Sequence, residues 1–340
     1  MVGKLKFLVV RLSSIGDIIQ CMGVIGGIRQ KFGDRVEIHW ITRKDMVGTL
    51  SMDKRIDRIW AFDRETGLPG LLRMARELRK EHFDYLYDAH SNIRSRILRA
   101  VVSPFPWGTP RVAVRRKHRL KRLLLFWLRI DLFDKPFRGV VSFRKPLKKW
   151  GIDRFPDTYR DWSFPAEVCR RYEHCIDGNT VTLIPSANYP MKRWPVEHYR
   201  RLISLLPDRR FVILGGPGDT FCEQIRDQAP DRVVNLAGKT SLTDSNYIVS
   251  RSRLVISADT GFMHAADLFH VPTLALIGPT AFGFPTGASV EVLETPLPCR
   301  PCTKDGRGRC RQSVYRKCMV DITPEQVARR AEAILSREPR

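Results

Sequence analysis

Strand-length apolar runs alternate with helix-length segments along most of this chain. In the first half the runs lie at residues 5–10, 36–41, 58–62 and 85–87, bounded by polar residues, glycine or proline. Residues 17–32 carry apolar side chains at helical spacing, which predicts a helix with one buried face. Strands that alternate with helices are typical of parallel sheets wrapped by helices. The pattern therefore predicts an α/β fold.

The alternation starts again after a Pro- and aromatic-rich stretch at residues 153–165. The second set of predicted strands lies at residues 180–184, 211–214, 233–236, 254–257 and 273–277. Because 340 residues are many for one hydrophobic core, we expect two domains, over residues 1–160 and 161–322, followed by a helix over residues 323–340. Ligands of such sheets bind beyond the carboxyl ends of the strands, so we expect the site in the cleft between the domains.

The positive charge is concentrated in the first half of the chain. The net charge is +23, and residues 1–160 hold 35 Lys and Arg against 16 Asp and Glu. Residues 94–149 alone carry 17 basic and 2 acidic side chains, a density that attracts phosphate, nucleic acid or anionic lipid. A solvated surface remains the alternative for any single Lys or Arg. No leader peptide or bilayer-length apolar run of ~20 residues is evident, so we expect a cytosolic protein.

Three loops of the second half follow predicted strands and combine hydroxyl, cationic, carboxylate and small residues. Alone, each is compatible with an ordinary helix cap, and none is a Walker A loop or a G-x-G-x-x-G turn. Together they predict a site for a nucleotide diphosphate at one sheet edge, with phosphates near a helix N-terminus and Asp219 near the ribose. The candidate donor-binding residues are Ser186, Lys192, Gly216, Asp219, Asp259, Thr260, Gly261 and His264.

Residues 11–20, RLSSIGDIIQ, lie between the first predicted strand and the first helix. Without further evidence, this motif indicates only that Asp17 caps the first helix. Opposite a diphosphate site it becomes a candidate proton acceptor, because a carboxylate can take the proton from an attacking hydroxyl.

Four segments in order along the chain carry a family resemblance. They read RLSSIGDII, PSANYPMKRWPVEHY, ISADTGFMHAADLFHVPTLALIGPT and CRPC…C…CMVDITPEQV. In this combination the chain resembles the bacterial lipopolysaccharide heptosyltransferases, glycosyltransferase family 9. The resemblance implies a GT-B architecture, in which two Rossmann-like domains with parallel sheets face each other across a cleft. It further implies an acceptor-binding N-terminal domain, a donor-binding C-terminal domain, and a last helix that packs back on the first domain.

The resemblance also implies a reaction and residue roles. The reaction is inverting, metal-independent transfer of heptose from ADP-heptose to the inner core of lipopolysaccharide. The family's S-S-x-G-D motif places the general base at Asp17, its K-R/H-W-P segment places Lys192 on the diphosphate, and its D-T-G-x-x-H motif places Asp259 and His264 at the donor. The candidate acceptor-binding residues are Ser14, Gly16, Asn92, Arg94 and Lys117.

Two segments depart from the family pattern, both on the acceptor side. Gln20, Cys21, Met22 and Gly23 follow the base motif where many relatives have His, Thr, Leu and Pro. Residues 90–92, His-Ser-Asn, stand where relatives have Q-G-N or Q-G-L. The departures leave another glycan acceptor or another nucleotide sugar as the alternative function. A nucleic-acid-binding protein is a further alternative, prompted by the charge but without a recognisable motif.

Residues 117–129, KHRLKRLLLFWLR, have an amphipathic helical pattern flanked by cations. The pattern is typical of a helix that lies in a membrane interface, and a core-packed helix with a charged outer face is the equal alternative. The predicted partners are therefore a nucleotide sugar, a phosphorylated glycolipid and an anionic membrane surface, with no specific nucleic acid. The predicted location is the cytoplasm, peripherally at the inner face of the cytoplasmic membrane.

Four of the eight cysteines lie close together, in the spacing C-x2-C-x7-C-x7-C. They are Cys299, Cys302, Cys310 and Cys318. Four thiolates can hold a structural zinc ion, but the spacing is not a standard finger or ribbon pattern, and reduced, unliganded cysteines are the alternative. Catalysis itself is expected to need no cofactor.

Overall fold

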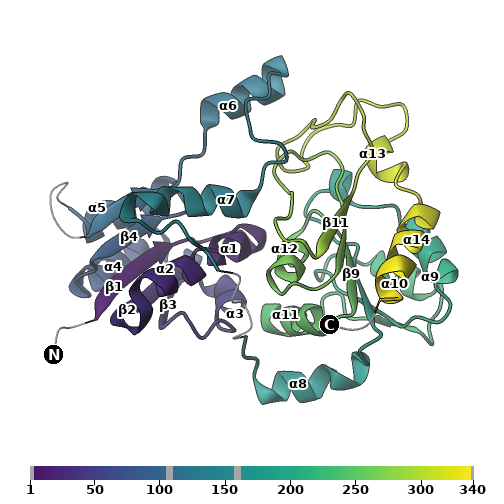
Figure 1. The fold of residues 1–340 in the computed structure, drawn as a ribbon, viewed down its shortest axis with the longest axis horizontal. Helices are drawn as coiled ribbons and strands as arrows, with labels where there is room; N and C mark the ends of the chain where they lie inside the picture. Colours follow the sequence, from purple (N-terminus) through teal and green to yellow (C-terminus); the bar gives the residue numbers. More distant parts are fainter. Residues whose placement is uncertain (1–3, 105–109, 157–161, 338–340) are drawn as a thin grey trace. The chain divides into compact units, whose positions relative to one another are not determined.

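The chain folds into two compact units, each built on a parallel sheet (Figure 1). The computed structural model describes residues 4–104, 110–156 and 162–337. Unit 1 comprises Met1–His118 and Val140–Ser163, and unit 2 comprises Arg119–Gly139 and Phe164–Arg340. The predicted α/β class with two Rossmann-like, parallel-sheet domains is confirmed.

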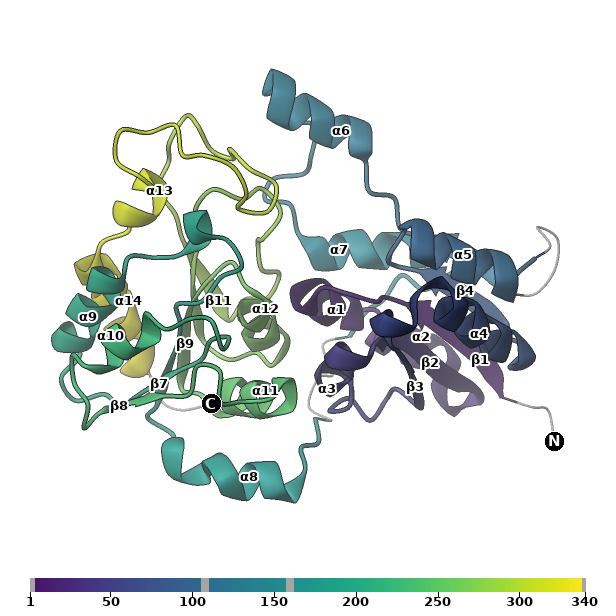
Figure 2. The same ribbon diagram turned by 180° about the vertical axis from the view of Figure 1, so that it is seen from behind.

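Unit 1 contains a five-stranded sheet in the order β3-β2-β1-β4-β5. Its central strand pairs on both sides, with Leu5 opposite Val36 and Phe7 opposite Tyr85. Helices α4 and α5 pack together on one face of the sheet (Figure 2), where they bury Leu71 and Leu98 against the strands. The strands are β1 (Leu5–Val10), β2 (Val36–Arg43), β3 (Arg58–Phe62), β4 (Tyr85–Asp88) and β5 (Arg111–Val114); the α-helices are α1 (Ile15–Met22), α2 (Ile25–Phe32), α3 (Val47–Leu50), α4 (Gly67–Lys80), α5 (Ile93–Val102) and α7 (Gly139–Arg144).

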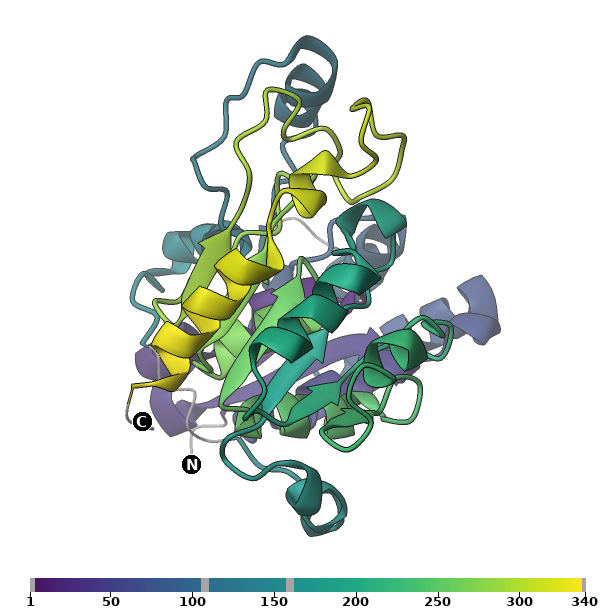
Figure 3. The same cartoon turned by 90° about the vertical axis from the view of Figure 1, so that its right-hand side faces the viewer.

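Unit 2 contains a six-stranded sheet in the order β11-β10-β9-β6-β7-β8. Helices α9 and α14 lie side by side on one face of this sheet (Figure 3), and their apolar side chains share one core with the strands. The strands are β6 (Val181–Ile184), β7 (Phe211–Ile213), β8 (Val233–Asn235), β9 (Leu254–Ala258), β10 (Thr273–Leu276) and β11 (Val290–Leu293); the α-helices are α6 (Arg119–Leu123), α8 (Ala166–Tyr172), α9 (Val196–Leu205), α10 (Cys222–Arg226), α11 (Leu242–Arg251), α12 (Gly261–Leu268), α13 (Lys317–Val320) and α14 (Pro324–Leu335). Within the described ranges, none of the helices has both the length and the apolar character that crossing a bilayer requires.

The predicted helix over residues 17–32 is two helices, α1 and α2, separated at Gly23. Glycine has a low helix propensity, and the Gly23 and Val24 amides donate to Gln20 and Cys21, three residues back, which tightens the turn. Both sheets also contain an edge strand that the sequence did not predict, β5 in unit 1 and β11 in unit 2.

The division of the chain differs from the expected one in two places. The boundary expected between residues 160 and 161 lies outside the described residues, but the structure groups Arg119–Gly139 with unit 2. This grouping has a physical cause, because Leu125 is 3% exposed and Arg129 Nη1 donates to the Pro301 carbonyl at 2.7 Å. Helix α14 belongs to unit 2 as well, because Val327 and Ala331 are fully buried in the unit 2 core, and its packing against the first domain stays a prediction.

Candidate active site

The predicted donor-binding loops of unit 2 follow strands that are neighbours in its sheet. Strands β10, β9, β6 and β7 are adjacent and parallel, so their carboxyl ends lie at one edge. Ser186 follows β6, Gly216 follows β7 and Asp259 follows β9. The structure thus brings together the three loops that the sequence singled out.

An ion pair between Lys192 and Asp259 lies at the centre of these loops. Lys192 Nζ is 3.0 Å from Asp259 Oδ2, and the two side chains are only 14% and 13% exposed. Thr280 Oγ1 donates to the same carboxylate at 2.8 Å, and His264 Nε2 lies 4.0 Å from Asp259 Oδ1. Burial acts to raise the pKa of Asp259, but Lys192, His264 and the Thr280 hydroxyl outweigh it, and the pKa is lowered. Asp259 is therefore a carboxylate at neutral pH that fixes Lys192 in place.

Helix α12 begins directly beside this ion pair. Thr260 is its N-cap, with Oγ1 accepting from the Met263 amide at 3.3 Å, and Gly261 is the first helical residue. The first amides of a helix lack intrahelical acceptors, and together with the helix dipole they favour an anion at this end. His264 is 5% exposed on the same helix. A cation and a helix N-terminus thus lie together where the sequence predicts a diphosphate.

Asp219 joins the loops that follow β6 and β7. Its carboxylate accepts from Ser186 Oγ, from the Gly216 amide at 2.8 Å and from Arg193 Nη2 at 3.0 Å. Asp219 is 8% exposed, so its carboxylate is buried among these partners. The observed role of Asp219 is to hold two loops together, and its contact with a ribose stays a prediction.

Thr280 and Gly283 belong to this site, although the sequence analysis did not select them. A Cβ atom on Gly283 would lie 2.2 Å from Asp259 Cγ, so only glycine lets this loop approach the carboxylate. The signal that could have found Thr280 is its place in the loop that follows β10, since Asp259 lies in the loop that follows the neighbouring strand β9.

In unit 1, Asp17 lies in the first turn of α1 and pairs with a buried arginine. Arg11 Nη2 is 2.5 Å from Asp17 Oδ2, and the exposed fractions of the two side chains are 5% and 37%. Arg11 Nη1 donates to the Ala89 carbonyl at 2.8 Å, and Ser14 Oγ donates to Asp17 Oδ2 at 3.3 Å. A rigid guanidinium thus orients a carboxylate that solvent can still reach. Arg11 was missed in the sequence, where its only signal is that it directly follows the first strand.

A second buried guanidinium, that of Arg115, shares an aromatic ring with Arg11. The guanidinium carbons of Arg115 and Arg11 lie 3.8 and 5.3 Å from the Phe143 ring centre. Burial lowers the pKa of Arg115, and Asp17 opposes this effect. The immediate surroundings of Asp17 therefore hold more positive than negative charge.

His90 lies in the same positive surroundings. It is 8% exposed, and burial, with Arg11 and Lys117 adding to it, lowers its pKa to about 3. Its ring is therefore neutral at physiological pH. Burial also raises the pKa of the Cys21 thiol, which lies near Arg11 and Arg115, to about 12, so this cysteine is not a nucleophile.

The five predicted acceptor-binding residues all lie in unit 1, with different local roles. Ser14 is the N-cap residue of α1, and Gly16 is in its first turn. Asn92 caps α5, accepting from the Ser95 amide at 3.0 Å. Arg94 and Lys117 lie close enough to His90 to lower its pKa. Their contact with an acceptor stays a prediction.

The four clustered cysteines are free thiols, and their described side chains are not arranged as a metal-binding group. In the described part of the chain, no group of three or more His, Cys, Asp or Glu side chains could hold a metal ion. Cys299, Cys302 and Cys310 lie close enough to Cys318 to raise its pKa. Two of the thiols also have backbone partners: Cys302 Sγ lies 3.9 Å from the Pro279 carbonyl, and Cys310 Sγ accepts from the Arg316 amide at 3.3 Å. Burial raises the pKa of Cys318 to about 11, which disfavours its thiolate.

Comparison with known proteins gives consistent matches in sequence. A model of the family described as Glycosyltransferase family 9 (heptosyltransferase) matches residues 71–310. A lipooligosaccharide heptosyltransferase 2 from Haemophilus influenzae is 29% identical over 184 residues, which are 51% of this chain and 53% of that protein. The chain thus spans about half the length of the curated relatives that it matches first.

Solved structures match over almost the whole chain. A family 9 glycosyltransferase from Veillonella parvula has a TM-score of 0.79 at 20% identity and covers 98% of both chains. Escherichia coli heptosyltransferase WaaC with ADP-2-deoxy-2-fluoro heptose has a TM-score of 0.70 at 16% identity, covering 97% of this chain and 99% of that chain. At these identities the structural matches establish the shared fold.

Proposed function

The chain belongs to glycosyltransferase family 9 (heptosyltransferase), and from this premise we propose that it transfers heptose from ADP-heptose to an inner-core lipopolysaccharide acceptor. The match over residues 71–310 confirms the family predicted from the sequence motifs. The observation that carries the proposal is the buried Lys192–Asp259 pair beside the N-terminus of α12. Both belong to motifs that the family resemblance assigns to the donor.

Unit 2 has the charges that a nucleoside diphosphate leaving group needs. Lys192 Nζ and the first amides of α12 supply positive charge, and Asp259 keeps the ammonium group in position. A relative with the same fold, WaaC, is described as bound to an ADP-heptose analogue, which supports ADP-heptose as the donor. We propose that these protein cations, rather than a metal ion, stabilise the departing ADP.

In unit 1, Asp17 is the proposed general base. An acceptor hydroxyl gives its proton to the Asp17 carboxylate while its oxygen forms a bond to the anomeric carbon of the donor. The bond from that carbon to the β-phosphate oxygen breaks, its electron pair leaves with ADP, and the configuration at the anomeric carbon inverts. The salt bridge with Arg11 orients the base, and its 37% exposed side chain is accessible to a hydroxyl.

The surroundings of Asp17 also favour an anionic acceptor. Arg11 and Arg115 are buried near a single carboxylate, and Arg94 and Lys117 add positive charge around His90. Phosphate or carboxylate groups of an inner-core glycolipid would balance this charge. We propose that these residues hold the acceptor.

The activity is tested by offering the purified protein ADP-heptose, UDP-sugars and GDP-sugars with heptose-deficient lipopolysaccharide. Mass spectrometry should show the acceptor gaining one heptose with ADP-heptose alone. Turnover of a UDP- or GDP-sugar without turnover of ADP-heptose would overturn the proposed donor.

We further propose that the protein binds peripherally to the inner face of the cytoplasmic membrane through α6 and the π-helical turn Leu124–Leu128. Four apolar side chains of this segment are at least half exposed, which supports the interfacial interpretation over the core-packed one. They are Leu120, Leu123, Trp127 and Leu128, at 69%, 50%, 80% and 64%. Flanking cations supply attraction to an anionic surface, about 1 kcal/mol for each one.

Reversing two of these charges tests membrane binding. The double variant Arg119→Glu, Arg122→Glu should weaken sedimentation with phosphatidylglycerol vesicles by at least thirtyfold, because roughly 2 kcal/mol of attraction is lost before repulsion is counted. ADP binding should not change. Equal sedimentation of variant and wild type would contradict the membrane proposal.

A further inference from the structure

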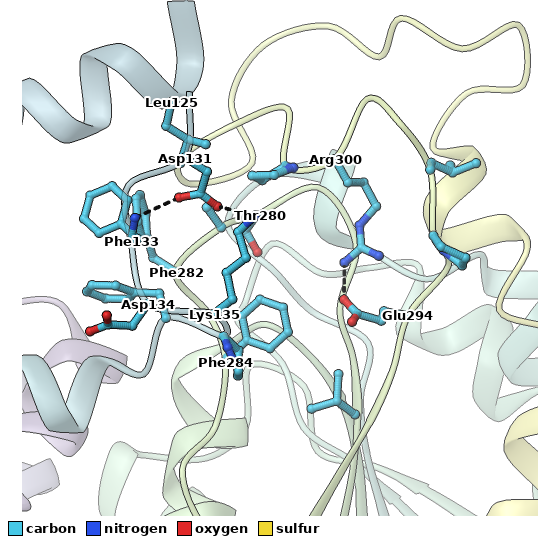
Figure 4. Close-up of a pocket in the computed structure, with 17 residues that line it drawn as sticks. Leu125, Asp131, Phe133, Asp134, Lys135, Thr280, Phe282, Phe284, Glu294 and Arg300 are labelled. Atoms are coloured by element: carbon cyan, nitrogen blue, oxygen red, sulfur yellow. Dashed lines mark hydrogen bonds and ion pairs between the residues drawn. The ribbon is translucent and has the colours of Figure 1, made fainter. Parts of the chain in front are cut away.

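Unit 2 contains a pocket of about 610 Å³ (Figure 4), which is within the ~300–1,000 Å³ range of ligand sites. One wall is the segment 125–137, which carries Leu125, Phe133 and Phe137; the opposite side is formed by residues 280–284 and 292–301. Phe282 contacts Phe133 and Phe137 edge-to-face, with ring centres 5.2 and 5.0 Å apart. The walls are therefore mainly aromatic and aliphatic.

Four polar side chains that line the pocket bond to the protein itself, namely Arg300, Glu294, Asp131 and Lys135. Arg300 donates to the Gly278 and Thr295 carbonyls and to Glu294 Oε2, at 2.7, 2.6 and 2.7 Å. Asp131 accepts from the Phe133 amide at 3.0 Å and lies 3.5 Å from Lys135 Nζ (Figure 4). A polar ligand would have to break these bonds, whereas a hydrocarbon would leave them intact.

The segment that forms the first wall is also cationic. Residues 119–139 hold six Lys and Arg against two Asp. Two of the cations lie on aromatic rings of the pocket: the Arg122 guanidinium carbon is 4.6 Å from the Phe282 ring centre, and Lys121 Nζ is 5.9 Å from that of Phe133. The segment thus combines an apolar pocket with charges that attract an anionic head group.

The same segment has a second, outward-facing apolar side. Leu125 is buried in the pocket wall, whereas Trp127 and Leu120 are 80% and 69% exposed. A segment that presents exposed Trp and Leu among cations is suited to the interface of an anionic bilayer. Phospholipid chains would then be the hydrocarbon nearest to the pocket.

We propose that this pocket binds one acyl chain of an anionic phospholipid, with the phosphate next to Lys121 and Arg122. The site differs from the glycosyl transfer site proposed above: the two share Thr280, but Asp17, Lys192 and Asp259 do not line the pocket. Loop 280–284 lies between the two, with the Thr280 hydroxyl and Gly283 toward Asp259 and Phe282 and Phe284 in the pocket.

Calorimetric titration with lysophosphatidylglycerol, below its critical micelle concentration, tests the proposal. We expect saturable binding, about fourfold weaker for each methylene removed from the chain. Glycerophosphoglycerol, which has the same head group and no chain, should not bind measurably. Equal binding of the head group alone would overturn the proposal.

Two variants, one in segment 280–284 and one in segment 292–301, fill the pocket and separate this site from other apolar surfaces. Ala281→Phe and Val292→Phe should each raise the Kd for lysophosphatidylglycerol at least tenfold. Ala100→Phe is the matched control, because Ala100 is exposed on α5 of unit 1 and the same side chain is added. ADP titration of each variant shows whether the donor site is intact. A Kd unchanged in a filled variant that still binds ADP would also overturn the proposal.

Discussion

The two units each place a carboxylate beside a cation near the start of a helix, but the two pairs differ in accessibility and charge balance. Asp259 in unit 2 is 13% exposed and is held by Lys192 and Thr280. Asp17 in unit 1 is 37% exposed, and its partner Arg11 is accompanied by a second buried guanidinium, Arg115. The difference indicates different uses: the enclosed carboxylate positions a cation, and the accessible one can exchange a proton with a substrate.

The largest effect should come from removing the accessible carboxylate. Asp17→Asn keeps the shape of the side chain but removes the proposed base, so we expect kcat to fall roughly a thousandfold while the Kd for ADP stays the same. The measurement is steady-state transfer with ADP-heptose, together with calorimetric ADP binding.

Asp45→Asn is the control for this change. Asp45 is a 56% exposed carboxylate of the same unit, paired with Arg43, so its loss should not alter kcat. Wild-type turnover by Asp17→Asn, or equal losses in both variants, would contradict the assignment of the base.

Removing the enclosed carboxylate should act mainly on stability. Asp259→Asn leaves Lys192 buried without its counter-charge, and the free energy of unfolding should fall by roughly 3 kcal/mol. Urea unfolding measures the loss. Glu223→Gln, in an exposed pair with Arg226, should cost less than about 1 kcal/mol. Similar losses for the two variants would show that Asp259 is no more important than a surface charge.

The burial of His90, together with the positive charge around it, should appear as a pH dependence of stability. His90 has a pKa of about 3 in the folded protein and 6.5 as the ordinary value, so the unfolded chain binds the proton more tightly. Its contribution is present above pH 6.5 and is lost progressively as the pH falls toward 3. Between pH 6.5 and about pH 5 the wild type should lose roughly 1.5 kcal/mol more than His90→Gln. Urea unfolding at each pH measures this difference. An equal change in the free energy of unfolding of the two proteins over this pH range would contradict the neutral, buried state of His90.

The smallest effect should come from the hydroxyl that supports the enclosed carboxylate. Thr280→Val removes one of the hydrogen bonds of Asp259 and keeps Lys192, so the free energy of unfolding should fall by about 1 kcal/mol. Urea unfolding checks this value. A loss as large as that of Asp259→Asn would mean that the hydroxyl, rather than the ion pair, holds the site together.

Most strands could be predicted because they are continuous apolar runs. Those at residues 5–10 and 58–62 have the predicted bounds, and the central strands of unit 2 deviate by one residue at an end. The two strands that were missed, Arg111–Val114 and Val290–Leu293, are short, carry charged residues and lie at sheet edges. Edge strands are buried less completely than central strands. Their sequences are therefore less uniformly apolar and predict a strand less clearly.

The part of the candidate site that could be predicted is the set of residues on loops that follow predicted strands. Lys192 and Asp259 were each placed on a loop, but their ion pair joins residues far apart in sequence. Arg115 was counted only as part of a basic segment, although burial against Phe143 makes it unlike its exposed neighbours. The cysteine spacing pointed to a metal site that the described residues do not form, because spacing does not define how thiols point.

By itself, the sequence of this protein determined its α/β class, its two-domain plan, its family and the loops on which a donor and a base are expected. These are local properties: apolar periodicity, strand ends and short motifs. Only the tertiary structure decided that Lys192 is held by Asp259, that Arg11 orients Asp17, and that Arg119–Gly139 forms a pocket with unit 2. The reason is physical, since partners, burial and cavities depend on which distant segments pack together.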